Sequence, residues 1–367
     1  MILRIEDIKN ICSNILQAVD SNELSKITET LELIVKDKIL YINVTNKEYF
    51  VSFKIPLFED IDFHATVNAH IFLKLISKTT VETIEMSIVD SALIIKGNGT
   101  YSLPLIYDGE ELLELTPIEL INTTASFEIK TNILKNIYKY NTSELNKGAF
   151  VQPVQKLYYI DENGAITFTS GACVNSFSLP CSIKLLLNSK VVKLFDALTD
   201  DVTSFTMSQD TASSNNNQTK VRFEDSHLCI TSLINADDDL LNSVPVEAIR
   251  EKSTQNYNYT VTLNRNELLQ AIERLIVFVN NNIKPYAMFE FNSDNLVIYD
   301  CQKINFENIT YTGNPVEDSY CSILDLLDIK QTLSALPSDY ITIKFGNKTN
   351  IVINMNNVDY IIPECVI

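Results

Sequence analysis

The chain contains little glycine, little histidine and no tryptophan. There are 8 glycines and 3 histidines among 367 residues, whereas glycine makes up about 7% of an average protein. Enzymes that hold phosphate groups on backbone amides concentrate glycine in the loops that do so. The seven cysteines include no Cys-x-x-Cys pair, and with so few histidines they form no zinc constellation. The composition therefore argues against phosphate-binding loops and structural zinc.

Sequence motifs of common enzyme classes are also missing. The chain has no GxxxxGK[ST], GxGxxG, HExxH or GxSxG pattern. Adjacent carboxylates such as Glu6-Asp7 and Glu110-Glu111 are expected to be solvated, as is the run 237–239. We therefore predict no catalytic residue, no cofactor and no metal. The absence of an apolar run near 18 residues and of a signal-like segment predicts a cytoplasmic protein without membrane contact.

Basic residues are scarce in the chain as a whole but not in its predicted helices. The sequence has 29 Lys and Arg against 47 Asp and Glu, a formal net charge of −18. Helices are predicted at 5–19, 70–78, 131–143, 188–199, 265–281 and 323–336. Together they hold ten basic and seven acidic residues, so the helices are locally positive on a negative chain. Lysines on solvated helix faces are common, however, so this distribution alone also allows an ordinary surface.

The stretch Tyr259–Asp300 has the clearest local pattern. Within its helix, apolar residues recur every three or four positions. These residues are Leu268, Leu269, Ile272, Leu275, Ile276 and Val279. Asn264 is the expected N-cap, and Asn292–Asn295 is the expected turn of a following strand hairpin. Such a unit cannot bury its own apolar stripe and must pack against a similar one.

The same helix-and-hairpin pattern recurs along the chain. It begins again at Met1 and at Ser126, and a second helix and hairpin follows each of the three copies. An internal repeat of this kind predicts the architecture. We predict an α+β fold of three tandem helix-hairpin domains, with boundaries at 1–122, 123–253 and 254–367.

Four stretches of the sequence resemble those of a known protein family. The opening LRIEDIKNICSNILQAV, the block TFTSG at 167–171, the segment NELLQAIERLIVFVNNNIK and the ending YIIP occur in the order and spacing of the bacterial DNA sliding clamp. That family is the β subunit of the replicative DNA polymerase III. The likeness extends over nearly the whole chain, and the departures from the family pattern suit a divergent or phage-encoded member.

The resemblance implies a head-to-tail homodimer that forms a ring, with helices lining the hole and strands outside. The hole encloses double-stranded DNA without reading its sequence, and the ring serves as a processivity factor in DNA replication. Its partners are the replicative DNA polymerase and a clamp loader. The DNA-binding residues would be Lys9, Lys26, Lys74, Lys78, Lys135, Lys139, Lys147, Lys190, Lys193, Arg265, Arg274 and Lys330. Lys26 stands near the place of an arginine that touches DNA in the family.

The family also has a pocket for short linear peptides of its partners. Carried over by local alignment, its walls would be Pro153, Thr169, Gly171, Cys173, Val174, Leu241, Val244, Asn350, Ile361, Ile362, Pro363 and Glu364. The dimer interface would pair edge strands near 96–103 and 304–312. Tyr101 of one copy would then face Val277 and Phe278 of the other.

Two rival hypotheses remain open at this stage. One is a non-catalytic, β-rich structural or scaffold protein built from the same repeats. The other is an enzyme whose site leaves no sequence motif. Low glycine opposes the enzyme, and a scaffold has no need for basic residues on its helices. The sliding clamp is the preferred hypothesis.

Overall fold

The chain folds into two compact units of mixed helix and strand. The computed structural model describes residues 1–19, 26–142, 152–211, 217–234, 238–279, 285–314 and 316–365. Unit 1 comprises Met1–Lys135 and Asn188–Asn235, and unit 2 comprises Asn136–Leu187 and Ala236–Ile367. The predicted α+β class is confirmed. The predicted division into three domains stays a prediction, because each unit contains part of the middle segment.

Unit 1 contains an eight-stranded sheet, a four-stranded sheet and a small two-stranded pair. The eight-stranded sheet follows the order β11 (Thr123–Lys130), β16 (Val202–Thr211), β17 (Asn217–Glu224), β18 (Leu228–Ile234), β4 (Tyr49–Pro56), β3 (Ile39–Thr45), β2 (Thr30–Lys36) and β5 (His64–Asn68). The four-stranded sheet follows the order β1 (Ile2–Arg4), β6 (Thr83–Val89), β7 (Ala92–Lys96) and β8 (Thr100–Pro104). The pair is β9 (Tyr107–Asp108) with β10 (Glu111–Leu112). The antiparallel contact of β18 with β4 joins the middle segment to the first.

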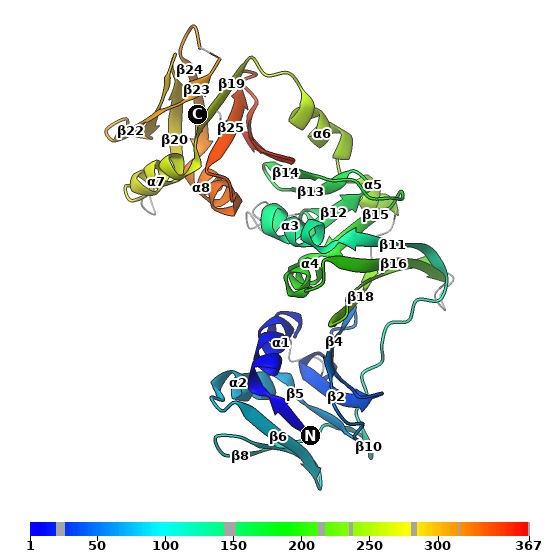
Figure 1. Ribbon diagram of the computed structural model, residues 1–367. Coiled ribbons are helices and arrows are strands. Elements are labelled where there is room, and N and C mark those ends of the chain that lie inside the picture. The colour runs from blue at the N-terminus through cyan, green and yellow to red at the C-terminus, as the bar shows by residue number, and fades with distance from the viewer. Residues whose placement is uncertain are drawn as a thin grey trace. The chain divides into compact units, whose positions relative to one another are not determined.

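Three predicted helices lie in unit 1 (Figure 1). They are α1 (Ile5–Ala18), α2 (Ala69–Lys78) and α4 (Ser189–Lys193), the last continued by the 3₁₀ helix η4 (Leu194–Ala197). Helix α1 packs against both α2 and α4. A short 3₁₀ helix, η1 (Lys26–Glu29), precedes β2. The prediction of one helix over 188–199 was therefore right in place, although the helix tightens after Lys193.

Unit 2 is built on a nine-stranded and a four-stranded sheet. The nine-stranded sheet follows the order β15 (Lys184–Asn188), β12 (Leu157–Asp161), β13 (Gly164–Phe168), β14 (Ala172–Ser176), β27 (Val358–Pro363), β26 (Asn350–Met355), β25 (Tyr340–Phe345), β19 (Tyr259–Asn264) and β23 (Thr312–Gly313). The other sheet follows the order β22 (Phe306–Thr310), β21 (Asn295–Asp300), β20 (Tyr286–Phe291) and β24 (Tyr320–Asp325). Strands β14 and β27 pair antiparallel, with Ala172 opposite Ile361 and Cys173 opposite Tyr360.

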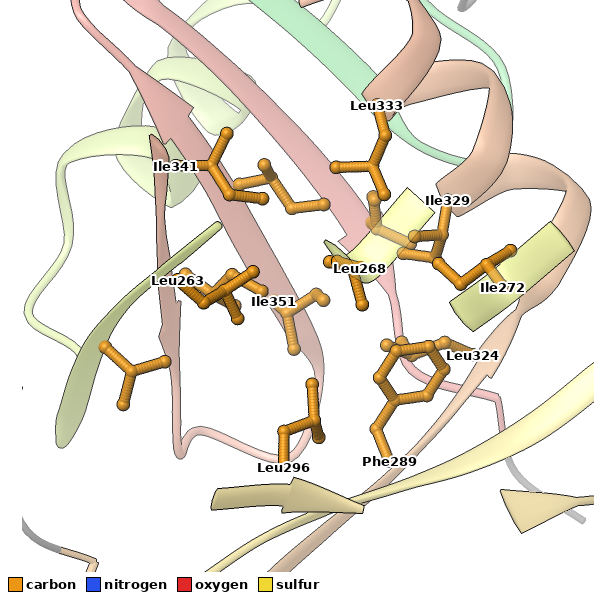
Figure 2. Close-up of a cluster of buried hydrophobic side chains, with 14 of the residues drawn as sticks. Leu263, Leu268, Ile272, Phe289, Leu296, Leu324, Ile329, Leu333, Ile341 and Ile351 are labelled. Carbon is orange, nitrogen blue, oxygen red and sulfur yellow. The ribbon is translucent and has the colours of Figure 1, made fainter. Parts of the chain in front are cut away.

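The core of unit 2 is formed by two packed helices and the sheets beside them. Helix α7 (Arg265–Ile276) packs against α8 (Leu326–Ala335). Figure 2 shows Leu268 and Ile272 of α7 with Ile329 of α8 in one cluster, which extends from Leu333 at the top of the view to Phe289 at the bottom. All five side chains are almost fully buried. Of the predicted apolar stripe, Leu268, Ile272 and Leu275 are buried, whereas Leu269, Ile276 and Val279 are partly buried against the same cluster. The helix ends at Ile276, before Val279.

Three more helices in unit 2 complete the fold. Helix α3 (Thr131–Asn141) begins in unit 1 and continues into unit 2. Helices α5 (Asp238–Asn242) and α6 (Val246–Thr254) precede β19, and the 3₁₀ helix η3 (Pro153–Lys156) precedes β12. The sequence did not predict α5 and α6. Of the helices in the described ranges, none has the length and apolar character needed to cross a membrane.

Local signals were confirmed where they depended on one residue type. Asn264 caps α7, because its side-chain oxygen accepts hydrogen bonds from the amides of Asn266 and Glu267 at 2.9 and 3.1 Å. The β2–β3 turn has positive φ at Asp37 and Lys38 (53° and 59°), as a two-residue hairpin turn requires. The turn 292–295 joins β20 to β21 as predicted.

Gly164 illustrates why the few glycines present are needed. It follows the β12–β13 turn at φ +149°, and a Cβ there would lie 2.4 Å from the carbonyl oxygen of Asn175. We expect Gly164→Ala to destabilise unit 2 by about 2–4 kcal/mol, because the paired strand must shift. Thermal unfolding of the variant measures this. Gly109→Ala is the control for backbone strain: φ is also positive there (+66°), but nothing lies within 4 Å of its Cβ position. The control should lose less stability than Gly164→Ala, and an equal loss in both variants would contradict the explanation.

Candidate functional site

The lysines predicted to face DNA lie on the helices as expected. In unit 1, Lys74 and Lys78 on α2 and Lys193 on α4 are exposed, while Lys9 on α1 and Lys190 on α4 are half-buried. Because α1 packs against α2 and α4, these side chains belong to one group of helices (Figure 1). This arrangement concentrates positive charge on the helical part of a strongly negative chain.

Helix α3 carries two further predicted lysines one turn apart. Lys139 is exposed and its Nζ lies 5.7 Å from the centroid of the Tyr140 ring, while Lys135 is half-buried. Two further predicted cations are Lys26 and Lys147. Lys26 begins η1, and Lys147 lies outside the described residues.

The three predicted cations of α7 and α8 contact other groups of unit 2. Arg265 donates hydrogen bonds to the carbonyl oxygens of Ser338 and Leu333 at 2.8 and 2.9 Å. It thereby supplies donors to the last turn of α8. Arg274 makes a two-pronged ion pair with Glu307, both N–O distances being 2.7 Å. Lys330 lies 3.1 Å from Glu273. Helix position alone therefore overstated the positive charge available on these two helices.

Several residues of the predicted peptide pocket meet on one face of the nine-stranded sheet. This face, here called the α6 face, carries Val174 of β14, Ile361 of β27 and Ile166 of β13. Val244 and Ile249 pack onto them from the α5–α6 segment, and Leu241 is partly buried against the same cluster. The side chains of Val174 and Ile361 are each only 4% exposed. These side chains form one apolar cluster, and α6 covers it.

Two predicted pocket residues lie on the opposite face of that sheet. Cys173 and Ile362 belong to the core cluster that includes Tyr140 and the α7 and α8 side chains. The reason is the two-residue period of a strand: neighbours of Val174 and Ile361 in sequence must point the other way. Cys173 and Ile362 cannot share a groove with Val174 and Ile361, so this part of the prediction was wrong.

The remaining predicted pocket residues lie at the ends of these strands. Pro153 is exposed in η3, while Thr169 and Gly171 are half-buried in the turn before β14. Asn350 is buried, and its side chain donates a 2.7 Å hydrogen bond to the hydroxyl of Tyr257. Pro363 ends β27, and Glu364 beyond it accepts a 2.7 Å hydrogen bond from Tyr320. These residues border the α6 face without forming its floor.

Polar contacts hold α6 against the sheet. Arg250 donates a 2.6 Å hydrogen bond to Asp161 of β12, and this contact raises the pKa of the Arg250 guanidinium. The hydroxyl of Ser253 donates to Asp359 of β27. The hydroxyl of Tyr257 donates to the carbonyl of Lys252 at 2.7 Å. These polar contacts all lie in the second half of the helix.

A cleft opens beside the start of α6. It has a volume of about 600 Å³ and is lined by residues of β12, of the loop after it and of the α5–α6 segment, among them Tyr159, Glu162, Leu241, Val244 and Arg250. Burial raises the pKa of Tyr159 to about 12, and the nearby Asp161 carboxylate adds to this. The cleft borders the α6 face and is more polar than the cluster under the helix.

The three residues predicted at a dimer interface are exposed apolar groups near sheet edges. In unit 1, Tyr101 lies on β8, the end strand of its sheet, and is 37% exposed. In unit 2, Val277 and Phe278 follow α7 and are 77% and 53% exposed. They line a hollow of about 590 Å³ together with Ile304 and Phe306, beside the end strand β22. Exposed apolar groups next to an open sheet edge are typical of a protein-protein contact.

No model of a protein family and no curated protein matches the chain. Solved structures do match it along its full length.

Three solved structures represent these matches. The DNA polymerase III beta subunit of Thermotoga maritima is 15% identical, with a TM-score of 0.78 over 100% of this chain and 99% of that one. The sliding clamp of Bacillus subtilis is 16% identical, with a TM-score of 0.76 over 100% and 98%. The Pseudomonas aeruginosa clamp bound to griselimycin is 12% identical, with a TM-score of 0.80 over 100% and 99%. The chain therefore has the fold of the DNA polymerase III beta-subunit sliding clamps.

Proposed function

We propose that the chain is a sliding clamp. Two copies form a ring around duplex DNA and tether a replicative polymerase to it, without catalysing a reaction. The observation that carries this proposal is the full-length likeness to sliding clamps at TM-scores of 0.76 to 0.80. The exposed helix lysines in a chain of net charge −18 support it independently.

The charge pattern suits a protein that must hold DNA and still slide. Lysines that contact phosphates bind every sequence equally, because phosphates carry no sequence information. Such contacts are weak and screened by salt, so a closed ring rather than affinity provides the long residence on DNA. The acidic remainder of the surface keeps DNA from binding elsewhere. A ring without ends also needs a clamp loader to open it.

The two open sheet edges give the proposed ring its contacts. In the proposed dimer, β8 of one copy pairs with β22 of the other, and Tyr101 covers Val277 and Phe278. The contact occurs twice, because a head-to-tail ring of two copies has two equivalent junctions. The exposure of these three side chains in the single chain supports the assignment.

The α6 face is the proposed docking site for the polymerase. A partner that must be exchanged during replication is better bound through a short segment than through a broad interface. Val174 and Ile361 supply an apolar floor, and the neighbouring cleft of about 600 Å³ offers polar groups at its border. A few buried anchors are sufficient for such binding.

Retention on end-blocked DNA tests the proposed function. The protein is threaded onto a linear duplex that carries biotin at both ends, and streptavidin then blocks the ends. We expect the protein to remain on the blocked duplex during gel filtration and to leave once a restriction enzyme cuts the DNA. Equal retention on blocked and unblocked duplex would show ordinary binding and would overturn the ring. Longer products of the replicative polymerase from the same source in single-encounter primer extension would support the tether.

The cations of unit 2 offer a matched pair of variants. Arg265→Ala is expected to lower the free energy of unfolding by about 1–3 kcal/mol, because charged hydrogen bonds to the end of α8 are lost. It should leave the salt dependence of DNA retention unchanged. Lys139→Ala removes an exposed lysine. It should weaken the salt dependence of DNA retention and leave the free energy of unfolding unchanged. Thermal unfolding and retention at several salt concentrations distinguish them, and equal effects of both variants on retention would contradict the assignment.

A further inference from the structure

Helix α6 has the composition of a bound amphipathic peptide. Its inner side consists of Val246, Ile249 and Ser253, at spacings of three and four residues, and Ile249 is 7% exposed. Glu247, Ala248, Glu251, Lys252 and Thr254 on the other side are all exposed. A helix of nine residues is marginal in isolation. Its helical structure therefore depends on the sheet beneath it.

The sheet presents a complementary surface. Ile249 packs into the cluster formed by Val174 and Ile361, while Val246 packs at its border. Two carboxylates from different strands lie within reach of the polar groups of the helix: Asp161 of β12 accepts from Arg250, and Asp359 of β27 accepts from Ser253. Figure 1 shows α6 alongside β14, and the helix contacts both β14 and β27.

The segment is joined to the rest of unit 2 by irregular chain. Residues 255–258 after the helix contain no helix or strand, and the residue before it is Pro245. Only two apolar side chains and a few polar contacts anchor the helix itself. No strand pairing has to break if the helix leaves. The floor under it would then be open.

We propose that α6 occupies in cis the face on which a partner segment docks in trans. This inference rests on the proposed function and adds the chemistry of the partner to it. The partner is a short amphipathic segment with two aliphatic side chains three positions apart. A basic residue follows the second aliphatic one and reaches Asp161. Binding displaces α6.

The cis arrangement sets a threshold for docking. A segment tethered at both ends is present at an effective concentration in the millimolar range. A partner therefore binds the closed chain more weakly than the open one by the factor with which α6 favours its own site. A segment that binds weakly does not displace α6, whereas a segment that binds tightly does.

Replacing α6 tests this directly. In one variant, Val246–Thr254 is exchanged for a nine-residue Gly/Ser sequence. The probe is a fluorescein-labelled synthetic peptide with residues 244–256 of this chain, followed by fluorescence anisotropy. We expect the probe to bind the variant at least ten times more tightly than the parent chain. The same peptide with Ile249→Asp should bind neither protein.

A gentler variant decides the question if the replacement does not fold. Arg250→Ala with Ser253→Ala removes both carboxylate contacts and keeps the apolar ones. We expect faster hydrogen exchange over 246–254 and tighter probe binding than in the parent chain. Lys252→Ala, on the exposed side of the same helix, is the control and should change neither. Equal probe binding by the double variant and the parent chain, or binding by no variant, overturns the proposal.

The proposed function is tested on other surfaces and can fail separately. If the parent chain does not stay on end-blocked DNA, the clamp is refuted and the peptide result stands. If DNA retention is intact but the probe fails on the open variants, only the role of α6 is refuted. A polymerase peptide that binds parent and double variant equally well would also exclude α6 as the competing occupant.

Discussion

Phe278→Asp is expected to convert the proposed dimer into monomers. The wild-type side chain is 53% exposed in the single chain and lines the hollow that also contains Val277, Ile304 and Phe306. In the proposed ring the partner's β8 edge covers it. A carboxylate in that position would lose its water without gaining a cation, which costs roughly 3 kcal/mol or more at each junction. Because the ring has two junctions, the summed cost raises the dissociation constant of the dimer by about four orders of magnitude.

Sedimentation velocity at micromolar concentration measures this change. Arg274 lies in the same hollow but is already paired with Glu307, so it offers the new carboxylate little compensation. Tyr340→Asp serves as the control, since Tyr340 is 63% exposed but lies at the start of β25, in a different sheet from β22. The control should stay dimeric. A dimeric Phe278→Asp protein would show that the interface lies elsewhere.

Reversing four helix charges should abolish retention on DNA. Lys74, Lys78 and Lys139 are exposed and Lys135 is half-buried, each pair being one turn apart on α2 or α3. Changing all four to Glu alters the charge by eight per chain and replaces attraction to phosphates with repulsion. We expect the residence time on end-blocked DNA to fall at least ten-fold at low salt. The dependence of retention on salt should weaken at the same time.

A second set of lysines supplies the matched control. Lys36, Lys38, Lys47 and Lys348 are exposed on strands or turns rather than on helices. Their change to Glu alters the net charge equally. This variant should keep its residence time within about two-fold, because screened charges outside the ring act weakly. If both sets reduce retention alike while circular dichroism stays native, the helices do not form the path of the DNA.

The helices and hairpins could be predicted because their signals are local. The α7 stripe repeats every three or four residues, and Asn264 stands where a cap is needed. Each hairpin turn lies between runs of apolar residues, as at 292–295. The pattern occurs three times in the chain, which strengthened the prediction of each helix and hairpin. Local propensity and global packing agree in these segments.

The sequence did not predict helix α6, because the helix buries few side chains against the sheet. Only Val246, Ile249 and Ser253 face the sheet, and the charged residues between them resemble a linker. Pro245 before the helix and Glu247 in its first turn were the available start signals. The docking role of α6 depends on the sheet beneath it, whose strands β14 and β27 are far apart in sequence. No local pattern could reveal that floor.

Two further features of the candidate site depend on the folded chain. Local alignment placed Cys173 and Ile362 in the pocket because it ignores the alternation of side chains along a strand. Counting charges on helices could not show that Arg274 is paired with Glu307, which lies on a different element. A partner 33 residues away in sequence is recognised only once the chain is folded.

The pairing of β14 with β27 has a consequence for protein synthesis. Cys173 is paired with Tyr360, which lies almost two hundred residues later in the sequence. At about 5–20 residues per second, a ribosome needs on the order of 10–40 s to make the intervening stretch. During that time the nascent chain exposes an open strand edge at β14 and the apolar side chains of Val174 and Ile166. Unit 2 can therefore complete its sheet only after Val358–Pro363 have been made, and its unfinished form is a natural target for a chaperone.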